Sequence, residues 1–357
     1  MNVHTIFVEP ANYTNDLIEN VYEEAGINYS FLHSSSIASN DIKITSKAKW
    51  VFDQNNFLKN IQFLWNCSTT HDLIIFNGYS HPEFIPLWIF SFFNKSFIGI
   101  ESDTPYRETN GIKGLLKRIY LGIIFSNKKM LGLSGGNGLH KDLFLKYGMP
   151  AKRIFLLPMM VNNAKYYQLY KQERSPQSRL KFIFVGRLVP EKNLVLMVKA
   201  FKAVLQQGKM AELDIIGDGI CRNELEALIA GTTAIQLTGK KFGSALTEVY
   251  HNADVLILPS SFEPWGLVVN EALSAGLPVI CSSAVGAVND LVLNPDAGWI
   301  FEYSNEKGLT HILNDIIDHP TQIVEKAKRG QEYILNYWNY DLYRQGLKQI
   351  FDYGRKN

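Results

Sequence analysis

The chain has 357 residues, which is enough for two domains of ordinary size. Its 46% share of hydrophobic residues and 20% share of charged residues are typical of a globular α/β protein. The net charge of +2 excludes the global charge signature of a nucleic-acid-binding protein, so we expect no nucleic acid as a partner.

The three cysteines, Cys67, Cys221 and Cys281, are far apart and form no metal-binding or disulfide pattern, which indicates a reducing compartment. The N-terminus reads as a first strand, because no basic stretch precedes a long apolar one. The longest apolar run, within 84–100, is interrupted by polar residues and is too short to span a membrane. We therefore expect a cytoplasmic protein.

Strands and helices alternate in the first half of the chain. Period-2 and apolar runs predict strands, and 3.6-residue periodicity predicts helices. The strands are expected at 5–8, 28–32, 73–76, 97–100 and 130–133, and the helices at 14–25, 56–67, 84–93, 113–125 and 138–147. A polar segment at 166–179 reads as the linker to the second half.

The second half alternates more clearly. Strands are expected at 180–185, 212–216, 234–238, 254–259 and 278–281, with helices at 193–207, 222–230 and 244–252 and a helical tail over 331–351. This spacing predicts a parallel sheet with helices on both faces. Ligands of such sheets bind beyond the carboxyl ends of the strands.

The stretch 260–271 carries the clearest chemical signal. It holds two carboxylates, Glu263 and Glu271, that lie eight residues apart after a strand and into a helix. Eight helical residues span roughly 12 Å, so two such carboxylates can bind hydroxyl pairs at the two ends of a nucleotide sugar. The helix start at Pro264 and Gly266 can face a diphosphate.

A second motif covers 184–193. It places Arg187 and Lys192 in a loop between strand and helix, after Gly186, which permits close approach of a ligand. Arginine binds phosphate oxygens as a fork and lysine as a point charge. The alternative is a pair of solvated loop cations.

These two stretches resemble the E-x7-E and G-R-x-x-x-x-K signatures of retaining glycosyltransferases of family 4, with the likeness strong over 180–300. The resemblance implies an α/β protein of the GT-B fold, with two Rossmann-like domains facing across a cleft. It further implies an acceptor-binding domain over 1–165, a nucleotide-sugar donor domain over 166–336, and a last helix, 337–357, that crosses back to the first domain. A kink at 337–339 would suit that crossing, and the alternative is a plain terminal helix on the second domain.

The family pattern also assigns a donor site. Arg187 and Lys192 would stabilise the departing diphosphate, and Glu263 would bind sugar hydroxyls. Glu271 would bind the ribose, while the loops at 215–219 and 238–243 would meet the nucleotide. The implied donor contacts are Gly186, Arg187, Lys192, Gly217, Lys241, Phe242, Glu263, Pro264, Trp265, Gly266, Leu267 and Glu271.

The acceptor side carries a weaker signal. His81 follows a strand at a place where many family members have a histidine near the reacting sugar carbon. Asp103 or Glu101, at the end of another strand, would orient the acceptor hydroxyl or act as a base. Capping and turn roles remain open for His81 and Asp103. One departure from the family pattern is the loop 9–14, which lacks the usual glycines.

No D-x-D pair occurs in the sequence. Glycosyltransferases of the other common fold use that pair to hold a metal, so we expect no metal and no cofactor here, with Arg187 and Lys192 in the metal's place. The basic, apolar stretch 113–129 is interpreted either as a peripheral contact with an anionic membrane or as a core helix with a charged face.

The sequence thus predicts a retaining, metal-independent hexosyltransferase that uses a UDP- or GDP-sugar. The acceptor would be a saccharide or lipid-linked saccharide, in bacterial surface polysaccharide synthesis such as lipopolysaccharide or capsule, at the inner face of the cytoplasmic membrane. Two alternatives stay open: a non-hydrolysing nucleotide-sugar epimerase of the same fold, and a non-catalytic subunit that binds sugar nucleotides.

Overall fold

The computed structural model describes the chain except for residues 35–47, 49, 54–55, 171–178 and 357. The chain forms two compact units, and each is described by itself. Unit 1 comprises Met1–Met160 and Tyr340–Asn357, and unit 2 comprises Val161–Asn339. The expected boundaries were 165/166 and 336/337.

Unit 1 is built on a six-stranded parallel sheet in the order β2-β1-β3-β4-β5-β6. The strands are β1 (Val3–Phe7), β2 (Asn28–Phe31), β3 (Leu73–Asn77), β4 (Phe97–Ser102), β5 (Met130–Ser134) and β6 (Ile154–Leu156). The helices are α1 (Asn12–Leu17), η1 (Ile18–Tyr22), α2 (Glu23–Ala25), α3 (Phe57–Thr70), α4 (Phe84–Phe90), α5 (Gly111–Ser126), α6 (Leu139–Lys146), η2 (Ala151–Arg153) and α14 (Tyr340–Lys356).

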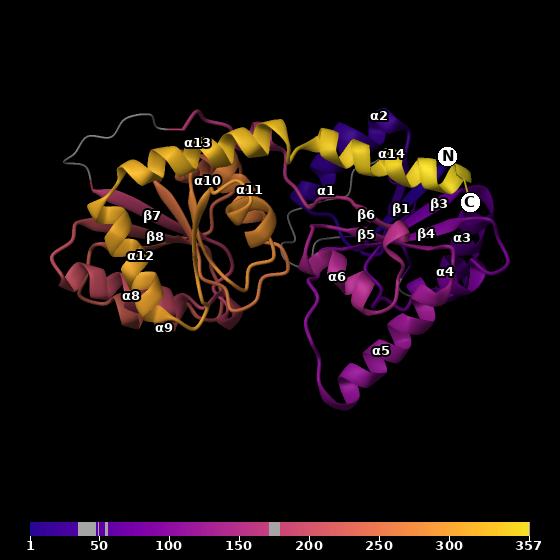
Figure 1. The fold of residues 1–357 in the computed structure, drawn as a ribbon, viewed down its shortest axis with the longest axis horizontal. Coiled ribbons are helices and arrows are strands. Elements are labelled where there is room, and N and C mark those ends of the chain that lie inside the picture. The colour runs from indigo at the N-terminus through magenta and orange to yellow at the C-terminus, as the bar shows by residue number, and fades with distance from the viewer. Residues whose placement is uncertain (35–47, 49, 54–55, 171–178, 357) are drawn as a thin grey trace. The chain divides into compact units, whose positions relative to one another are not determined.

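The C-terminal helix belongs to the first unit. Figure 1 shows α14, in yellow, lying beside elements from the start of the chain. Tyr343 on α14 is buried, and its hydroxyl lies 2.8 Å from the hydroxyl of Tyr22 in η1. Arg344, one residue further along, donates to the carboxylate of Glu24 and to the carbonyl of Asn20. These contacts attach the last helix to η1 and α2 of unit 1.

Unit 2 is a second parallel sheet, in the order β12-β11-β10-β7-β8-β9. Its strands are β7 (Leu180–Val185), β8 (Ala211–Ile216), β9 (Ile235–Gly239), β10 (Val255–Leu258), β11 (Val279–Ser282) and β12 (Gly298–Phe301). Its helices are α7 (Asn163–Tyr166), η3 (Pro190–Lys192), α8 (Leu194–Gln206), α9 (Arg222–Ile229), α10 (Gly243–Asn252), α11 (Leu267–Ser274), η4 (Val288–Leu293), α12 (Glu306–Asp318) and α13 (Thr321–Asn336).

Strand order sets where a ligand site can form in unit 2. The chain builds β7, β8 and β9 outward in one direction, then returns to place β10, β11 and β12 on the other side of β7. The connections therefore leave β7 and β10 in opposite directions, which opens a crevice at their carboxyl ends. The two sequence motifs follow β7 and β10, so they lie at this crevice.

Some elements differ from the sequence expectation. The helix expected at 14–25 is divided into α1, a π-helical turn and α2. In the helical tail, α13 ends at Asn336 and α14 begins at Tyr340, so the break lies at the kink expected over 337–339. The short strands β6 and β12 were not expected, because three or four residues are too few to show a clear hydrophobic pattern. Residues 171–178 of the expected linker lie outside the described residues, but the backbone of Gln168 and Tyr170 hydrogen-bonds to Gln331 in unit 2.

Candidate functional site

The loops after β7 and β10 meet in unit 2, at the crevice between the two strands. Lys192, at the end of η3, forms an ion pair with Glu263, and the two side chains are only 14% and 15% exposed. Ser260 Oγ donates a further hydrogen bond of 3.3 Å to the same carboxylate oxygen. The structure therefore joins the two sequence motifs through one charged pair, 71 residues apart.

Backbone contacts hold these loops in register. Asn193 adopts a left-handed conformation with φ of 54°, and its side-chain Nδ2 donates a hydrogen bond of 3.2 Å to the backbone carbonyl of Pro259. Ser261 N–H donates a hydrogen bond of 2.8 Å to the backbone carbonyl of Glu191. Because both loops are tied at the backbone, the Lys192–Glu263 pair is presented on a fixed frame.

The turn after β8 packs directly on the loop after β7. Gly217 has φ of 148°, and a Cβ at this position would lie 1.8 Å from the carbonyl oxygen of Gly186. Leu188 N–H donates a hydrogen bond of 2.9 Å to the backbone carbonyl of Asp218. Gly217 is required for this close approach of the two backbones. The structure thus brings Gly186 and Gly217, both expected at the donor site, into contact.

The remaining donor candidates follow neighbouring strands. Arg187 is exposed beside Gly186, and Phe242 and Lys241 are exposed in the loop after β9. Gly266 is the N-cap of α11 and has a φ of 100°. The first N–H groups of a helix have no partner within the helix, and in α11 they lie next to the loop that carries Glu263. A helix start of this kind favours an anion.

Glu271 lies on α11 and is held by two tyrosines. Tyr166 and Tyr250 donate hydrogen bonds of 3.1 and 2.5 Å to its two carboxylate oxygens. Burial raises the pKa of Glu271 to about 7, against the lowering effect of the tyrosine hydroxyls. The sequence did not single out either tyrosine, because they come from α7 and α10, and no local pattern links them to α11.

The structure differs from the expectation at Trp265. Its side chain is 2% exposed and stacks on Trp338, with ring centroids 5.4 Å apart. Its indole N–H donates a hydrogen bond of 2.9 Å to Oδ1 of Asn270. The indole is therefore part of the core of unit 2, and only the backbone of Trp265 is left to meet a ligand.

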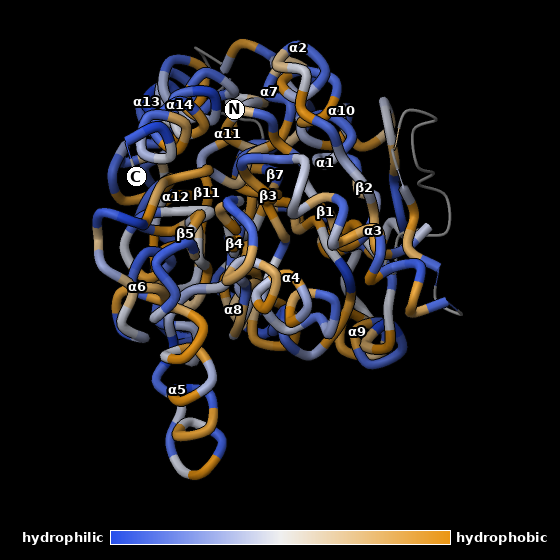
Figure 2. The backbone as a smooth tube through the Cα atoms, turned by 90° about the vertical axis from the view of Figure 1, so that its right-hand side faces the viewer, coloured by the Kyte–Doolittle hydropathy of each residue, from blue (hydrophilic) through white to orange (hydrophobic). Residues whose placement is uncertain are grey.

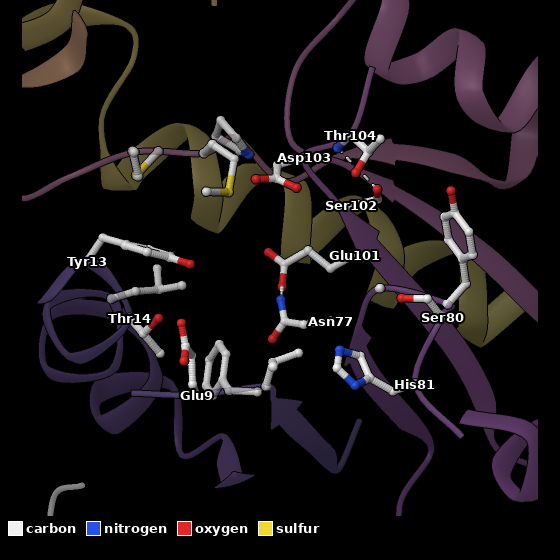
Figure 3. A pocket seen from close by; sticks show the side chains of 18 of the residues that line it. Glu9, Tyr13, Thr14, Asn77, Ser80, His81, Glu101, Ser102, Asp103 and Thr104 are labelled. Carbon is white, nitrogen blue, oxygen red and sulfur yellow. Dashed lines mark hydrogen bonds between the residues drawn. The ribbon is translucent and has the colours of Figure 1, made fainter. Parts of the chain in front are cut away.

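Unit 1 contains a cavity of about 360 Å³ at the carboxyl ends of β1, β3 and β4. The three acceptor-side candidates, His81, Asp103 and Glu101, all line it, together with Glu9 and Tyr13 (Figure 3). The loop 9–14, which departs from the family pattern, forms one wall. These residues belong to unit 1, and the donor candidates belong to unit 2.

Glu101 is the most constrained group of this cavity. Its side chain is 7% exposed, and its carboxylate accepts a hydrogen bond of 2.6 Å from Asn77 Nδ2. Burial raises its pKa to about 7; the charge of Asp103 adds to the rise, and hydrogen bonds from Asn77 and Tyr343 oppose it. Tyr343 comes from α14 and Tyr13 from α1, and sequence reasoning identified neither.

Residues 168–335 match the family model described as glycosyl transferases group 1. We call residues 168–335 the group 1 region, after the family model that they match. The group 1 region contains every donor candidate named above, from Gly186 to Glu271, and the acceptor-side candidates lie outside it.

Curated relatives match a part of the chain of similar length. The sulfoquinovosyl transferase SQD2 of Arabidopsis thaliana is 36% identical over 154 residues, which is 42% of this chain and 29% of that protein. A GDP-mannose-dependent alpha-mannosyltransferase of Mycolicibacterium smegmatis is 35% identical over 144 residues, or 39% of this chain and 36% of that protein. The matches thus span about a third of the length of these relatives.

Solved structures match the whole chain in fold. Anabaena HepE, crystallised in complex with UDP, superposes with a TM-score of 0.77 at 14% identity, over 99% of this chain and 100% of that one. The same protein was also crystallised with UDP-glucose, with a TM-score of 0.73. The chain therefore has the expected α/β GT-B fold, with two Rossmann-like units.

Proposed function

We propose that this protein is a retaining glycosyltransferase that moves a hexose-type sugar from a UDP- or GDP-sugar to a saccharide or lipid-linked saccharide acceptor. The observation that carries the proposal is the Lys192–Glu263 pair at the crevice of the group 1 region. The names of the relatives support a sugar-transfer reaction, and the UDP complexes of HepE support a nucleotide donor. Bacterial surface polysaccharide synthesis is the proposed setting.

In the proposed reaction, an acceptor hydroxyl oxygen forms a bond to the anomeric carbon while the bond from that carbon to the diphosphate oxygen breaks. The acceptor proton passes to the departing diphosphate. Arg187 and the start of α11 would offset the negative charge that develops on the diphosphate, in the way that preorganised donors stabilise other oxyanions. These groups are our basis for proposing that no metal is needed.

Glu263 and Glu271 would bind the two ends of the donor. Lys192 holds the Glu263 carboxylate in place, so that its free lone pairs can accept hydrogen bonds from sugar hydroxyls. Tyr166 and Tyr250 position Glu271 in the same way for the ribose. Arg187→Ala should lower turnover by on the order of 10²-fold, and Glu271→Ala should weaken nucleotide binding.

The deciding experiment is a thermal-shift panel of UDP-, GDP- and ADP-sugars, followed by product analysis with and without EDTA. A donor at 100 times its Kd stabilises the protein by about 2.7 kcal/mol. We expect one base to give a clear shift and Glu263→Gln to abolish turnover while the fold persists. No shift with any donor would refute the proposal, conversion of the donor without an acceptor would indicate an epimerase, and loss of transfer in EDTA would refute metal independence.

We also propose that unit 1 contacts an anionic membrane through 113–129, mainly through α5. Exposed apolar side chains recur on one face of α5 with helical spacing, at Ile112, Leu115, Leu116, Ile119, Tyr120 and Ile123. The opposite face packs on the unit through Leu121, Ile124 and Phe125. Figure 2 shows this helix projecting from the body of unit 1.

The charges beside this face suit a lipid surface. Lys113 and Arg118 lie on opposite sides of the apolar face by helical spacing, where their stems can reach lipid headgroups. Within the part of the chain that the structure describes, every helix is too short or too polar to cross a bilayer. Contact in the plane of the membrane interface is the mode that we propose.

Sedimentation with vesicles tests the membrane contact. We expect binding to phosphatidylglycerol vesicles and much weaker binding to phosphatidylcholine. Ile119→Glu should abolish binding, because a carboxylate would enter the apolar interface. Ile220→Glu is the matched control, since Ile220 is an 82% exposed apolar side chain of unit 2. Equal binding of both variants would refute the role of α5.

A further inference from the structure

A basic groove of about 1120 Å³ lies where the strands β3, β4, β5 and β6 of unit 1 begin. The cavity that contains His81 and Glu101 lies at the carboxyl ends of the strands, so the groove is at the opposite edge of the sheet. Among the described residues that line the groove, six are lysine or arginine and one is acidic: Lys95, Lys128, Lys129, Lys152, Arg153 and Arg355, with Asp72.

Four of these cations are exposed and lack an acidic partner. Lys95, Lys128, Lys152 and Arg355 form no ion pair with any carboxylate of the described chain. The carboxylate of Asp72 accepts a hydrogen bond of 2.7 Å from the N–H of Asn2. The positive charge of the basic groove is therefore not offset by the protein itself.

A buried charge lies at the same place. Arg153 is 6% exposed, and its guanidinium donates hydrogen bonds of 2.7, 2.5 and 3.2 Å to the backbone carbonyls of Phe125, Asn127 and Met130. Buried charges in proteins are normally paired with an opposite charge. In the part of the chain that the structure describes, this guanidinium meets carbonyl groups and no carboxylate, so its charge also favours an anion in the groove.

The basic groove adjoins the end of α5. Ser126, the last residue of α5, lines the groove, and Lys128 and Lys129 follow it directly. The apolar face of α5 that we propose as a membrane contact extends to Ile123, one turn before Ser126. An anion in the groove would therefore lie beside the end of that face.

Exposed aromatic side chains lie at the same end of unit 1. Phe92 and Phe93, just after α4, are 57% and 75% exposed. The residue before them, Ser91, accepts hydrogen bonds of 2.7 Å from Asn127 Nδ2 and 2.8 Å from Lys129 Nζ, which fixes this turn beside the residues that follow α5. Aromatic rings next to lysines are typical of a surface that enters the headgroup layer of a membrane.

We propose that the basic groove binds the headgroup of an anionic lipid that carries two phosphates, while α5 lies on the membrane. The inference rests on the membrane contact proposed above and adds to it the chemical class of the lipid. A headgroup with one phosphate would offset one charge, whereas several unpaired cations in one groove match two linked phosphates. The aromatic and apolar side chains beside the groove favour a lipid over a soluble polyanion, which could not use them.

Sedimentation of the full chain with two kinds of vesicle tests the lipid class. Both are made of phosphatidylcholine, and they contain either cardiolipin or phosphatidylglycerol at the same content of anionic phosphate. We expect binding to the cardiolipin vesicles to be tighter by about 5-fold or more, and binding to inorganic polyphosphate at the same phosphate concentration to be weaker than either. Equal binding to the two kinds of vesicle, or tighter binding to polyphosphate, would overturn the inference.

Variants link the preference to the basic groove. Lys128→Gln combined with Lys152→Gln should weaken binding to cardiolipin vesicles by on the order of 10-fold and remove the preference for cardiolipin. Lys141→Gln combined with Lys348→Gln is the matched control, because both lysines are exposed in unit 1, lie outside the groove lining and remove the same charge. A groove variant that binds cardiolipin vesicles as well as this control would overturn the inference.

The aromatic turn separates a lipid from a soluble anion. Phe93→Ser should weaken binding to both kinds of vesicle and leave binding to polyphosphate unchanged, because only the membrane offers an apolar layer for the ring. Full vesicle binding by Phe93→Ser would contradict the assignment to a lipid. Circular dichroism of each variant checks that the exposed substitutions leave the fold intact.

Failure of the inference can be told apart from failure of the proposed function. If Ile119→Glu abolishes vesicle binding but the groove variants and the lipid composition have no effect, only the inference falls. If the wild type binds no anionic vesicle, the proposed membrane contact falls with it. Sugar transfer from a nucleotide donor is judged separately, by the donor panel and product analysis, which need no membrane.

Discussion

The buried carboxyl of Glu101 should make the stability of unit 1 depend on pH in a direction opposite to that of an ion-paired carboxylate. Its pKa is raised from 4.5 to about 7, chiefly by burial. Between these values the folded protein keeps a proton that the unfolded chain has lost. The free energy of unfolding therefore falls as pH rises from 4.5 to 7, and is unaffected by this group below 4.5.

The magnitude follows from the size of the shift. A rise from 4.5 to about 7 corresponds to about 3 kcal/mol at pH 8. Glutamine has nearly the same shape and does not titrate. Glu101→Gln should therefore match the wild type in stability near pH 4.5, apart from a constant offset for altered hydrogen bonds with Asn77 and Tyr343, and gain on it by about 3 kcal/mol at pH 8.

Urea unfolding followed by circular dichroism at several pH values from 4.5 to 8 measures this difference, with two transitions fitted if the units unfold separately. Glu271 also has a raised pKa, but it contributes equally to both proteins, so the difference isolates Glu101. Glu108→Gln provides the exposed control. A stability difference between Glu101→Gln and the wild type that stays constant over this range would refute the reasoning.

Three further substitutions test the frame of unit 2. Trp338→Ala should lower the free energy of unfolding by about 3–5 kcal/mol, because it removes the buried ring on which Trp265 stacks. Gly217→Ala should cost at least ~1–3 kcal/mol and weaken donor binding, since its Cβ would strike the carbonyl of Gly186. Lys192→Met should cost about 1–3 kcal/mol, because a largely buried carboxylate would lose its partner.

Urea titration measures all three effects, and nucleotide-induced thermal shift separates folding from binding. Gly208→Ala is the control for Gly217→Ala: both glycines have positive φ, but nothing lies within 4 Å of a Cβ at Gly208. A Gly217→Ala variant no less stable than Gly208→Ala would contradict the packing argument. Wild-type stability of Trp338→Ala or Lys192→Met would likewise contradict the burial on which each prediction depends.

Much of unit 2 could be predicted because its signals are local. The run from Leu180 to Val185 is buried on both faces, so it reads as a strand, and the polar residues after it must lie at its carboxyl end. The run Val255–Leu258 is buried in the same way, so it also reads as a strand, β10, and Glu263 must follow its carboxyl end. Parallel strands bring such ends together, so the Lys192–Glu263 contact follows from motif position and strand order.

The sequence by itself determined the alternation of strands and helices and the chemistry of the two motifs, because turn residues and apolar periodicity act over a few neighbours. Tertiary structure alone decided the partners of the buried acids. Tyr343 meets Tyr22 across 321 residues beside Glu101, and Tyr166 meets Glu271 across 105. It also placed Trp265 in the core. Such contacts depend on the path of the whole chain, and local sequence patterns carry no information about that path.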